Sequence, residues 1–405
     1  MDFLINKLYV VVLEAIRVWR IFMYIVAYIG FKPIRTYITR KFYAAGIKIN
    51  DNTEPHNMIV HNDWFYHRIA CDGSLGWGES YAEGWWDCKK LDDYFYKILQ
   101  NGLYQELLFP WEKLIRYLTF DAFNRQIVGC SQEIADKHYD FGNPFFKSFL
   151  GTSMIYSCAY WIGAKNLDEA QQNKLQLIGR KLKLKPGMRV LDVGCGWGEL
   201  CKFLAQTYNV EVVGVTNSKE GAKEARQRCT GLHVDIRLQD YRDINESFDR
   251  IVSIELLEHV GRKNYRSFFE LMHRCLSDDG IFLLHTIGHD NDSIPRTEPF
   301  VWKHLIPNVM LPNHKSIPVA IDNLFCIEDW HNFGPHYEKT LLAWRDNFVI
   351  NWPTISRMYE NPTSSFYRKW TLYLNIGAAL FRARKAQVWQ IVLTKGLDGG
   401  YNSVR

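Results

Sequence analysis

The feature that most constrains this chain is the glycine-rich stretch Val190-Leu-Asp-Val-Gly-Cys-Gly-Trp-Gly198. It follows a run typical of a buried strand and precedes a helical pattern. Its glycines, Gly194, Gly196 and Gly198, allow a tight turn and a close approach of the backbone to a ligand. Apolar runs alternate with amphipathic stretches after it. This alternation predicts an α/β fold with a mainly parallel, seven-stranded, Rossmann-like sheet.

The same patterning gives the expected elements and domains. We expect strands at 189–193, 210–215, 232–238, 249–254, 280–286, 325–328 and 388–393, and helices at about 199–207, 219–229 and 263–276, with a helical insertion around 335–385. The earlier, aromatic-rich stretch is typical of short helices. We therefore expect an N-terminal extension (1–41), a small helical domain (42–130) and a catalytic domain (131–405).

Composition and charge exclude some classes of protein. Of the 405 residues 47% are hydrophobic, which is typical of a globular protein with a buried core. The first 41 residues carry seven Lys or Arg against two Asp or Glu, which equals the net charge of +5 of the whole chain. Because the remainder is neutral, nothing indicates nucleic-acid binding. The nine cysteines form no C-x-x-C pair, which argues against a metal site and favours a reducing cytoplasm.

The basic extension is also apolar. Residues 8–31 are rich in Val, Ile, Leu and aromatic residues, interrupted by Glu14, Arg17 and Arg20. The longest uncharged run, 21–31, is about half of the roughly 20 residues that a membrane-spanning helix needs. The three charges lie along one side of a helix, so we expect an interfacial helix on a membrane surface. The alternatives are a helix packed on the protein or on a second subunit, and a signal-like segment without a cleavage site.

The glycine loop also predicts a cofactor. Its G-x-G-x-G spacing, with Asp192 two positions before the first glycine, differs from the dinucleotide pattern G-x-G-x-x-G and resembles the loop of class I methyltransferases. The resemblance implies S-adenosylmethionine; the alternative is a structural glycine turn. Thr216 and Ser218 replace the acid expected after the second strand. Gln239 and Asp240, after the third strand, are candidates for the adenine, although a loop acid can simply be exposed.

Several short sequence motifs resemble those of the cyclopropane-fatty-acid synthase family, and the resemblance runs from about residue 42 to the C-terminus. They are Tyr156-Ser-Cys-Ala-Tyr-Trp161, Glu258-His-Val260, Leu284-His-Thr-Ile-Gly288, Glu328-Asp-Trp-His-Asn-Phe-Gly334 followed by Tyr337, and Phe381-Arg-Ala-Arg384 with Trp389-Gln390. The resemblance implies a methyl transfer to unsaturated acyl chains of membrane phospholipids that forms a cyclopropane ring. It also implies a lipid-binding helical domain, cofactor contacts from Tyr156 and Ser157, a peripheral location at the inner face of the cell membrane, and compatibility with a homodimer.

The family's chemistry explains the residue types. An alkene attacks the sulfonium methyl group, a carbocation forms, and a base must remove one proton from the new methyl group. The resemblance implies that bound bicarbonate is this base. Cys158 and Ile287 would hold it mainly through backbone groups, and Glu258, His285 and Tyr337 through side chains. Taken singly, each of these residues has a structural alternative as a core or helix-start residue.

Two positions depart from the family. Gly377 stands where many members have a cysteine, so the activity cannot depend on that thiol, and Asn217 replaces an apolar residue of the ribose loop. Three other functions stay open: a related lipid C-methyltransferase that gives methyl-branched or hydroxylated chains, a non-catalytic S-adenosylmethionine-binding membrane partner, and an enzyme for acyl chains on a carrier protein.

Overall fold

The computed structural model describes residues 2–106, 110–124, 126, 141–290, 298–358 and 364–405, which fall into two compact units. Unit 1 comprises residues 1–125, 293–307 and 359–385, and unit 2 comprises residues 126–292, 308–358 and 386–405. The expected boundary near 130 lies outside the described residues. No local pattern in the sequence indicates that the two later segments, 293–307 and 359–385, belong to the first unit.

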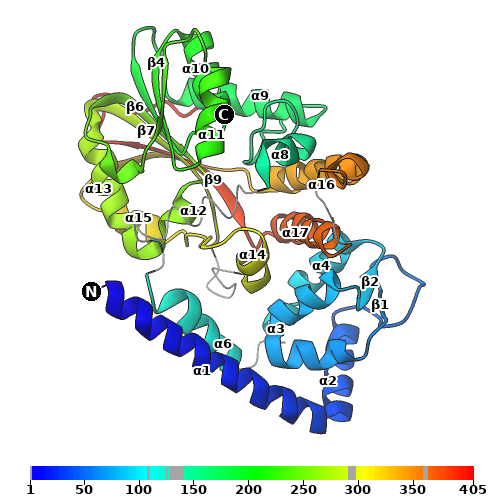
Figure 1. Ribbon diagram of the computed structural model, residues 1–405. Helices are drawn as coiled ribbons and strands as arrows, with labels where there is room; N and C mark the ends of the chain where they lie inside the picture. The colour runs from blue at the N-terminus through cyan, green and yellow to red at the C-terminus, as the bar shows by residue number, and fades with distance from the viewer. Residues whose placement is uncertain (1, 107–109, 125, 127–140, 291–297, 359–363) are drawn as a thin grey trace. The chain divides into compact units, whose positions relative to one another are not determined.

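Unit 2 contains a seven-stranded sheet with the order β5-β4-β3-β6-β7-β9-β8 (Figure 1). The strands are β3 Arg189–Val193, β4 Glu211–Thr216, β5 Val234–Leu238, β6 Phe248–Ile254, β7 Leu276–Gly288, β8 Cys326–Asn332 and β9 Gln387–Thr394. Strands β3 to β7 pair in parallel, whereas β9 is antiparallel to both β7 and β8. The prediction of a mainly parallel seven-stranded sheet is confirmed.

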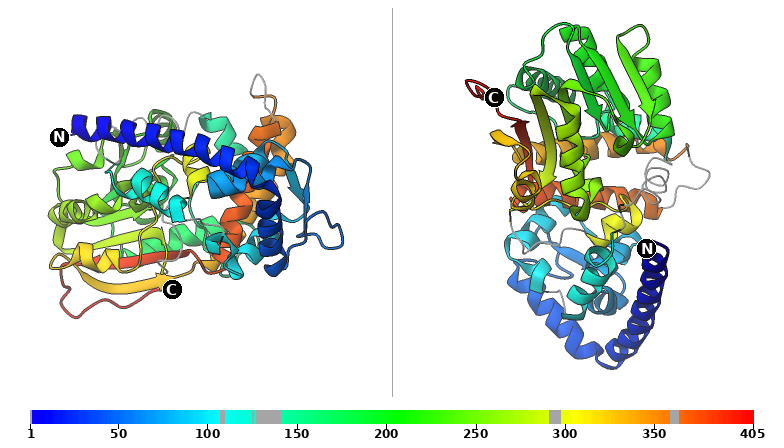
Figure 2. Two further views of the ribbon diagram at one scale, coloured as in Figure 1. Left: turned by 90° about the horizontal axis from the view of Figure 1, so that it is seen from below. Right: turned by 90° about the vertical axis from the view of Figure 1, so that its left-hand side faces the viewer.

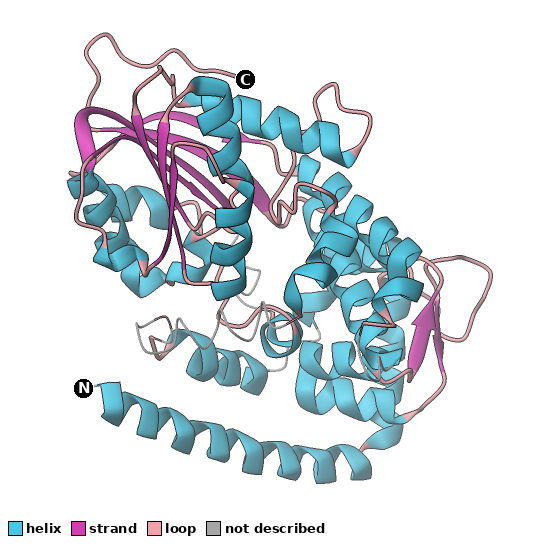
Figure 3. Ribbon diagram, turned by 45° about the horizontal axis from the view of Figure 1, so that its top comes forward, coloured by secondary structure: helices cyan, strands magenta, loops and turns pink. Residues whose placement is uncertain are grey.

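Helices cover both faces of this sheet (Figure 3), which explains why its strands are nearly continuous runs of Val, Ile and Leu. One face packs on α9 Leu167–Lys181, α10 Glu199–Tyr208 and α11 Lys219–Arg228, and the other on α13 Tyr265–Cys275 and α15 Ser316–Ile321. The expected helices at 199–207, 219–229 and 263–276 are confirmed. Unit 2 also contains α8 Gly142–Leu150, α12 Leu257–Val260 and α16 Pro335–Ile355, and the short turns η2 Tyr241–Asp243 and η3 Arg262–Asn264.

Unit 1 is mainly helical, as expected, but its helices are not all short. It contains α1 Asp2–Ile29, α2 Phe31–Ala44, α3 Trp64–Ala82, α4 Leu91–Gln100, α5 Leu103–Glu106, α6 Pro110–Arg116, η1 Tyr117–Asp121, α14 Pro299–His304 and α17 Ser364–Arg382, with the antiparallel pair β1 Met58–Val60 and β2 Trp86–Cys88. The core is an aromatic cluster that includes Phe42, Phe65, Trp77, Trp86 and Tyr94. Large rings bury much apolar area per residue, which suits a small unit.

The first two helices meet at an angle near Gly30 (Figure 2). Helix α1 packs on its own unit: Arg20 lies 3.3 Å from Asp72 of α3, Tyr24 donates to the same carboxylate at 2.6 Å, and the Tyr9 ring is 5.3 Å from that of Phe123. Of the three charges expected along one side of this helix, Arg20 is thus paired with a carboxylate of the same unit. Arg20 finds a carboxylate on α3, a partner that helical periodicity alone does not reveal.

Besides the exposed ion pair of Glu14 and Arg17, α1 presents a strip of exposed apolar side chains, which we call the α1 outer face. It consists of Val10, Val11, Val18, Trp19, Ile21, Phe22, Ile25, Val26 and Ile29, all exposed. Among the described residues, no helix combines the length and apolar character that a crossing of the bilayer requires. The extension thus contains a long helix that is packed along one side and presents an exposed apolar strip along another.

Candidate active site

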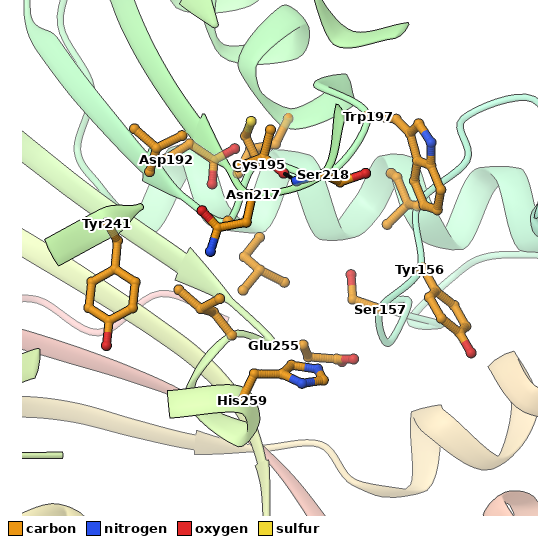
Figure 4. A pocket seen from close by; sticks show the side chains of 18 of the residues that line it. Tyr156, Ser157, Asp192, Cys195, Trp197, Asn217, Ser218, Tyr241, Glu255 and His259 are labelled. Carbon is orange, nitrogen blue, oxygen red and sulfur yellow. Dashed lines mark hydrogen bonds between the residues drawn. The ribbon is translucent and has the colours of Figure 1, made fainter. Parts of the chain in front are cut away.

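A cavity in unit 2 lies where β3, β4, β5 and β6 end (Figure 4). Parallel strands bring the loops at their carboxyl ends to one edge of the sheet, the usual place for a ligand in this fold. Of the predicted cofactor residues, the cavity is lined by Tyr156, Ser157, Asp192, Gly194, Gly196, Thr216, Ser218 and Gln239. Gly198 and Asp240 are not among its lining residues.

The glycine loop turns sharply between β3 and α10. Gly194, Gly196 and Gly198 have φ angles of 89°, 54° and 80°, a region that other residues enter only with strain. The amide groups of Gly194 and Cys195 both donate to the carbonyl oxygen of Val215 in β4, at 3.0 Å each. Gly198 precedes α10 and lies against Ala225, so it serves packing, whereas Gly194 and Gly196 face the cavity.

Asp192 lies at the inner wall of the cavity and is only 2% exposed. Burial raises the pKa of its carboxyl group to about 7, although the Cys201 thiol donates to Oδ2 at 3.3 Å and Lys174 is positively charged nearby. A positively charged ligand group would stabilise the ionised form. The amino group of methionine is such a group, so a buried acid at this position suits the cofactor that the loop predicts.

The loop after β4 combines a helix start with cavity lining. The Ser218 hydroxyl accepts from the amide of Gly221 at 3.0 Å and caps α11, and the Thr216 hydroxyl accepts from the amide of Ser218 at 3.2 Å. Asn217 lines the cavity between them (Figure 4). The hydroxyl groups therefore hold the loop in shape, and Asn217 supplies a polar side chain to the cavity.

After β5, Gln239 lines the cavity, whereas the Asp240 carboxylate is bound by Arg242. The Arg242 guanidinium donates to its two oxygens at 2.8 and 2.7 Å, and the Arg242 amide donates at 3.0 Å. Arg242 and Tyr241 themselves line the cavity. A role of Asp240 in cofactor binding stays a prediction, and it would require the carboxylate to serve both the arginine and a ligand.

Lys174, on α9, is a buried charged residue at the cavity that the sequence did not single out. It lines the cavity, is 1% exposed, and donates from Nζ to the Ser157 hydroxyl at 2.7 Å. Burial lowers its pKa to about 8, while the negative charges of Glu255 and Asp192 oppose this change. Its sequence signal is a lysine within the apolar stripe Leu167, Ala170, Lys174, Leu175, Ile178, where a hydrophobic residue is expected.

The predicted catalytic residues surround a carboxylate that we had not predicted, that of Glu255. The amide of Cys158 donates to Glu255 Oε1 at 2.8 Å, and the Tyr337 hydroxyl donates to Oε2 at 2.7 Å. His285 Nε2 lies 3.4 Å from Oε1. Glu255 directly follows β6 and lines the cofactor cavity. Its place just after a strand, at the edge where the site forms, was the signal that could have found it.

His285 is oriented by the sheet. It pairs with Gln390 in the register between β7 and β9, and the Gln390 amide nitrogen lies 3.3 Å from His285 Nδ1. With the amide as assigned, Nδ1 accepts and the proton of the neutral ring is on Nε2, facing Glu255. Burial lowers the pKa of His285, so the neutral form is the relevant one at pH 7.

Glu258 forms the second half of the cluster, and Oε1 accepts from the Thr286 hydroxyl at 2.9 Å and from the amide of Ile287. Burial, and next the nearby negative charge of Glu255, raise the pKa of Glu258 to about 8. The cluster thus combines two acids. The Glu255 carboxylate lies against Cys158, His285 and Tyr337, and the neighbouring Glu258 is protonated at pH 7. Within the described part of the chain, Glu258 Oε2 has no hydrogen-bond partner.

The five predicted catalytic residues are therefore close together but already have partners within the chain. The groups expected to hold bicarbonate through Cys158, His285 and Tyr337 face Glu255, and the Ile287 amide donates to Glu258. A second anion on the same donors would meet the Glu255 carboxylate at close range. The residues present do not fit bicarbonate.

They do fit S-adenosylmethionine. A methyl group added at Gly196 would meet no atom within 4 Å, so the cavity leaves open space at the turn. The buried Asp192 and the aromatic residues Tyr156 and Trp197 complete the wall. The sheet order, the glycine turn and this cavity define a class I S-adenosylmethionine-dependent methyltransferase.

Comparison with known proteins defines the family within this class. Residues 130–391 match the family described as mycolic acid cyclopropane synthetase, and the chain belongs to this family. It is 46% identical over 361 residues to the cyclopropane-fatty-acyl-phospholipid synthase of Escherichia coli strain K12, which covers 89% of this chain and 93% of that protein. The resemblance seen in the sequence is thereby confirmed.

Mycobacterial proteins are similar over the catalytic part. Cyclopropane mycolic acid synthase 1 of Mycobacterium tuberculosis strain H37Rv is 35% identical over 279 residues, covering 64% of this chain and 95% of that protein. The crystal structure of mycolic acid cyclopropane synthase CmaA1 with SAH and CTAB is 32% identical and has a TM-score of 0.60, covering 65% of this chain and 97% of that one. This protein is thus an S-adenosylmethionine-dependent enzyme related to lipid cyclopropane synthases.

Proposed function

We propose that this enzyme transfers the methyl carbon of S-adenosylmethionine to the cis double bond of unsaturated acyl chains in membrane phospholipids and closes a cyclopropane ring. The observation that carries the proposal is the Glu255 carboxylate, held by Cys158 and Tyr337 at the wall of the cofactor cavity. A base beside the methyl donor is what ring closure requires and what a simple methyl transfer does not. The similarity to the cyclopropane-fatty-acyl-phospholipid synthase of E. coli supports the substrate class.

The residues of the site have separate roles in the proposed reaction. Bound S-adenosylmethionine supplies an electrophilic methyl group. Asp192 and the glycine loop orient its methionine end, and Lys174, near Asp192, holds the Ser157 hydroxyl at the cavity wall. The half-buried Tyr156 and the buried Trp344, with ring centroids 5.3 Å apart, exclude water and present negative ring faces that tolerate a transient cation. Bicarbonate, which the family resemblance implied, has no part in this proposal because its donors are already engaged.

Mass spectrometry of the product tests the proposal. Purified full-length protein, S-adenosylmethionine and vesicles of unsaturated phosphatidylethanolamine should give acyl chains that gain one CH2 and lose the double bond. A gain of CH4 would indicate a saturated methyl branch, and a gain of CH4O would indicate methylation with addition of water. Either result would replace the cyclopropane assignment by a related lipid C-methyltransferase. Transfer to acyl chains on a carrier protein but not to vesicles would refute the phospholipid substrate.

We also propose that the α1 outer face contacts the membrane surface, with the enzyme peripheral at the cytoplasmic side. Its exposed apolar side chains resemble those of interfacial helices, and Lys32 and Arg40 of the following helix add positive charge for anionic lipids. A lipid-binding role of residues 42–130 and a homodimer stay predictions; light scattering measures the latter.

Point substitutions test the membrane contact better than a deletion, because α1 also packs on α3. The triple variant Val18→Ser, Phe22→Ser, Ile25→Ser changes side chains that are 66%, 53% and 58% exposed. Each apolar group placed in lipid contributes about 1.5–3 kcal/mol, so co-sedimentation with vesicles should fall more than tenfold. The control variant Val319→Ser, Ile350→Ser alters equally exposed residues of unit 2 and should bind normally. Equal binding by both variants would refute the contact.

A further inference from the structure

We infer that the Glu255 carboxylate is itself the general base of the reaction and replaces the bicarbonate that the family resemblance implies. The inference rests on the proposed function and deepens it by assigning the proton acceptor. It starts from the observation that the donors expected around bicarbonate surround the Glu255 side chain instead.

Both oxygens of the Glu255 carboxylate accept a hydrogen bond from groups that were expected to hold bicarbonate. Oε1 of Glu255 accepts from the Cys158 amide at 2.8 Å and faces His285 Nε2 at 3.4 Å, and Oε2 accepts from the Tyr337 hydroxyl at 2.7 Å. These are a backbone amide, an imidazole and a phenol, the set that would recognise a small oxyanion. Because both oxygens are engaged, the carboxylate is fixed in position and cannot rotate freely.

The backbone at Glu255 supports a functional role. Its φ angle is 48°, in the left-handed region, where a residue with a side chain is strained. Its amide donates to the carbonyl oxygen of His285 at 2.8 Å, which ties this conformation to β7. A glycine would adopt the same turn without strain. Strain of this kind persists where the surrounding structure enforces it, typically at active sites.

Glu255 also connects the two parts of the site. It lines the cofactor cavity together with Ser157 and Lys174, and through its oxygens it touches the catalytic residues Cys158 and Tyr337. Of the residues in the cluster, it is therefore the carboxylate placed to meet both the methyl donor and the substrate carbon that receives the methyl group. Glu258, in contrast, is engaged by Thr286 and Ile287.

The step balances without a further reactant. The π electrons of the alkene form a bond to the methyl carbon as the bond from that carbon to sulfur breaks, which leaves S-adenosylhomocysteine and a carbocation on the chain. A Glu255 oxygen then accepts a proton from the new methyl group, and the C–H electron pair closes the ring. Glu255 ends the cycle as a neutral acid and returns its proton to water when the products leave.

A carboxylate near a cation can also add to it and form an ester, and the geometry opposes this. A carboxylate has about four lone-pair directions; here the Cys158 amide and the Tyr337 hydroxyl each engage one, and His285 Nε2 lies 3.4 Å from Oε1 without forming a hydrogen bond, which leaves lone pairs for a proton. Hydrogen bonds to both oxygens reduce their nucleophilicity, and the anchored backbone limits their approach to carbon. Removal of a proton requires only that a small hydrogen atom of the new methyl group reach a lone pair of Glu255 that accepts no hydrogen bond.

The decisive experiment compares bicarbonate dependence across variants of the full chain. Turnover is measured with labelled S-adenosylmethionine and unsaturated phosphatidylethanolamine vesicles, in buffer stripped of carbon dioxide and again with added sodium bicarbonate. Wild type should be equally active in both. Glu255→Gln fills the same space without a base, so turnover should fall about 10²–10⁴-fold in both buffers. Glu255→Gly should fall similarly in stripped buffer and regain at least tenfold with bicarbonate, because the vacated donors can then bind the anion.

The controls separate this inference from folding and from the proposed function. Glu270→Gln, at an exposed acid on α13, should behave as wild type in both buffers, and unfolding curves with S-adenosylhomocysteine titrations confirm that each variant folds. Titration of bicarbonate into the S-adenosylhomocysteine complexes needs no turnover: Glu255→Gly should bind it, and wild type should not. Bicarbonate binding by wild type, loss of wild-type turnover in stripped buffer, or full activity of Glu255→Gln would overturn the inference. A product other than cyclopropane would refute the proposed function instead.

Discussion

Two of the three glycines at the turn after β3, Gly196 and Gly198, should differ in what they contribute, and a pair of alanine substitutions separates their roles. Gly198 has φ 80° and lies where an added methyl carbon would be 2.7 Å from Cβ and 3.0 Å from Cα of Ala225 in α11. Real carbon atoms do not approach so closely, so α10 and α11 would have to move apart. Gly196 has φ 54° with no atom within 4 Å of an added methyl carbon, and it lines the cavity.

The magnitudes follow from these contacts. Placing a side chain in the left-handed region costs roughly 1–2 kcal/mol at either position. Gly198→Ala adds an overpacking cost of about 1–3 kcal/mol, so we expect a total loss of about 2–5 kcal/mol. Gly196→Ala should lose only the backbone part, but its methyl group would occupy space that the methionine end of the cofactor needs, and affinity should fall at least tenfold.

Two assays measure the difference. Denaturant unfolding gives the free energies, and calorimetric titration with S-adenosylhomocysteine gives the affinities below the unfolding transition. Gly198→Ala should show the larger loss of stability and Gly196→Ala the larger loss of affinity relative to its stability. Equal stability losses in the two variants, or wild-type affinity in Gly196→Ala, would refute the assignment of one glycine to packing and the other to the cofactor.

Two further predictions concern buried charges. Lys174→Met removes the charged hydrogen bond to Ser157 and the positive charge beside Asp192. This substitution should weaken S-adenosylhomocysteine binding about 10- to 100-fold with little loss of stability. Unchanged affinity in a calorimetric titration would contradict this prediction. Glu258 has a folded-state pKa of about 8, raised from 4.5. The stability that its raised pKa contributes is therefore complete below pH 4.5 and lost as the pH rises to 8. The unfolding free energy of wild type minus that of Glu258→Gln should fall over this range by up to roughly 5 kcal/mol, and a difference that does not change with pH would contradict it.

The sequence could predict the sheet because local patterns carry that information. Strands buried on both faces need continuous apolar runs, and amphipathic helices need their own spacing, so β3 to β7 and their helices fall within a few residues of expectation. The glycine loop was equally clear, because a tight turn at positive φ restricts the residue type. The pair β1 and β2 was missed, since strands of three residues leave almost no periodic signal.

The candidate site was predictable only in part. Cys158, Glu258, His285, Ile287 and Tyr337 could be named by resemblance, and the structure brings them together. Glu255 and Lys174 could not, because their roles depend on which side chains face them across the fold. Glu255 stands three residues before Glu258 in the sequence. No local pattern distinguishes an acid exposed to solvent from one that accepts a hydrogen bond from Tyr337, 82 residues away.

The sequence by itself determined the fold class, the cofactor loop and the family, because turn geometry, periodic burial and short motifs are local properties. The tertiary structure decided which carboxylate occupies the centre of the site, since the donors on Glu255 come from a loop before α9, from β7 and from α16. It also decided that Arg20 pairs with Asp72 of α3, while Val18, Phe22 and Ile25 of α1 stay exposed. Hydrogen bonds and ion pairs between distant segments depend on the folded backbone, which no local pattern specifies.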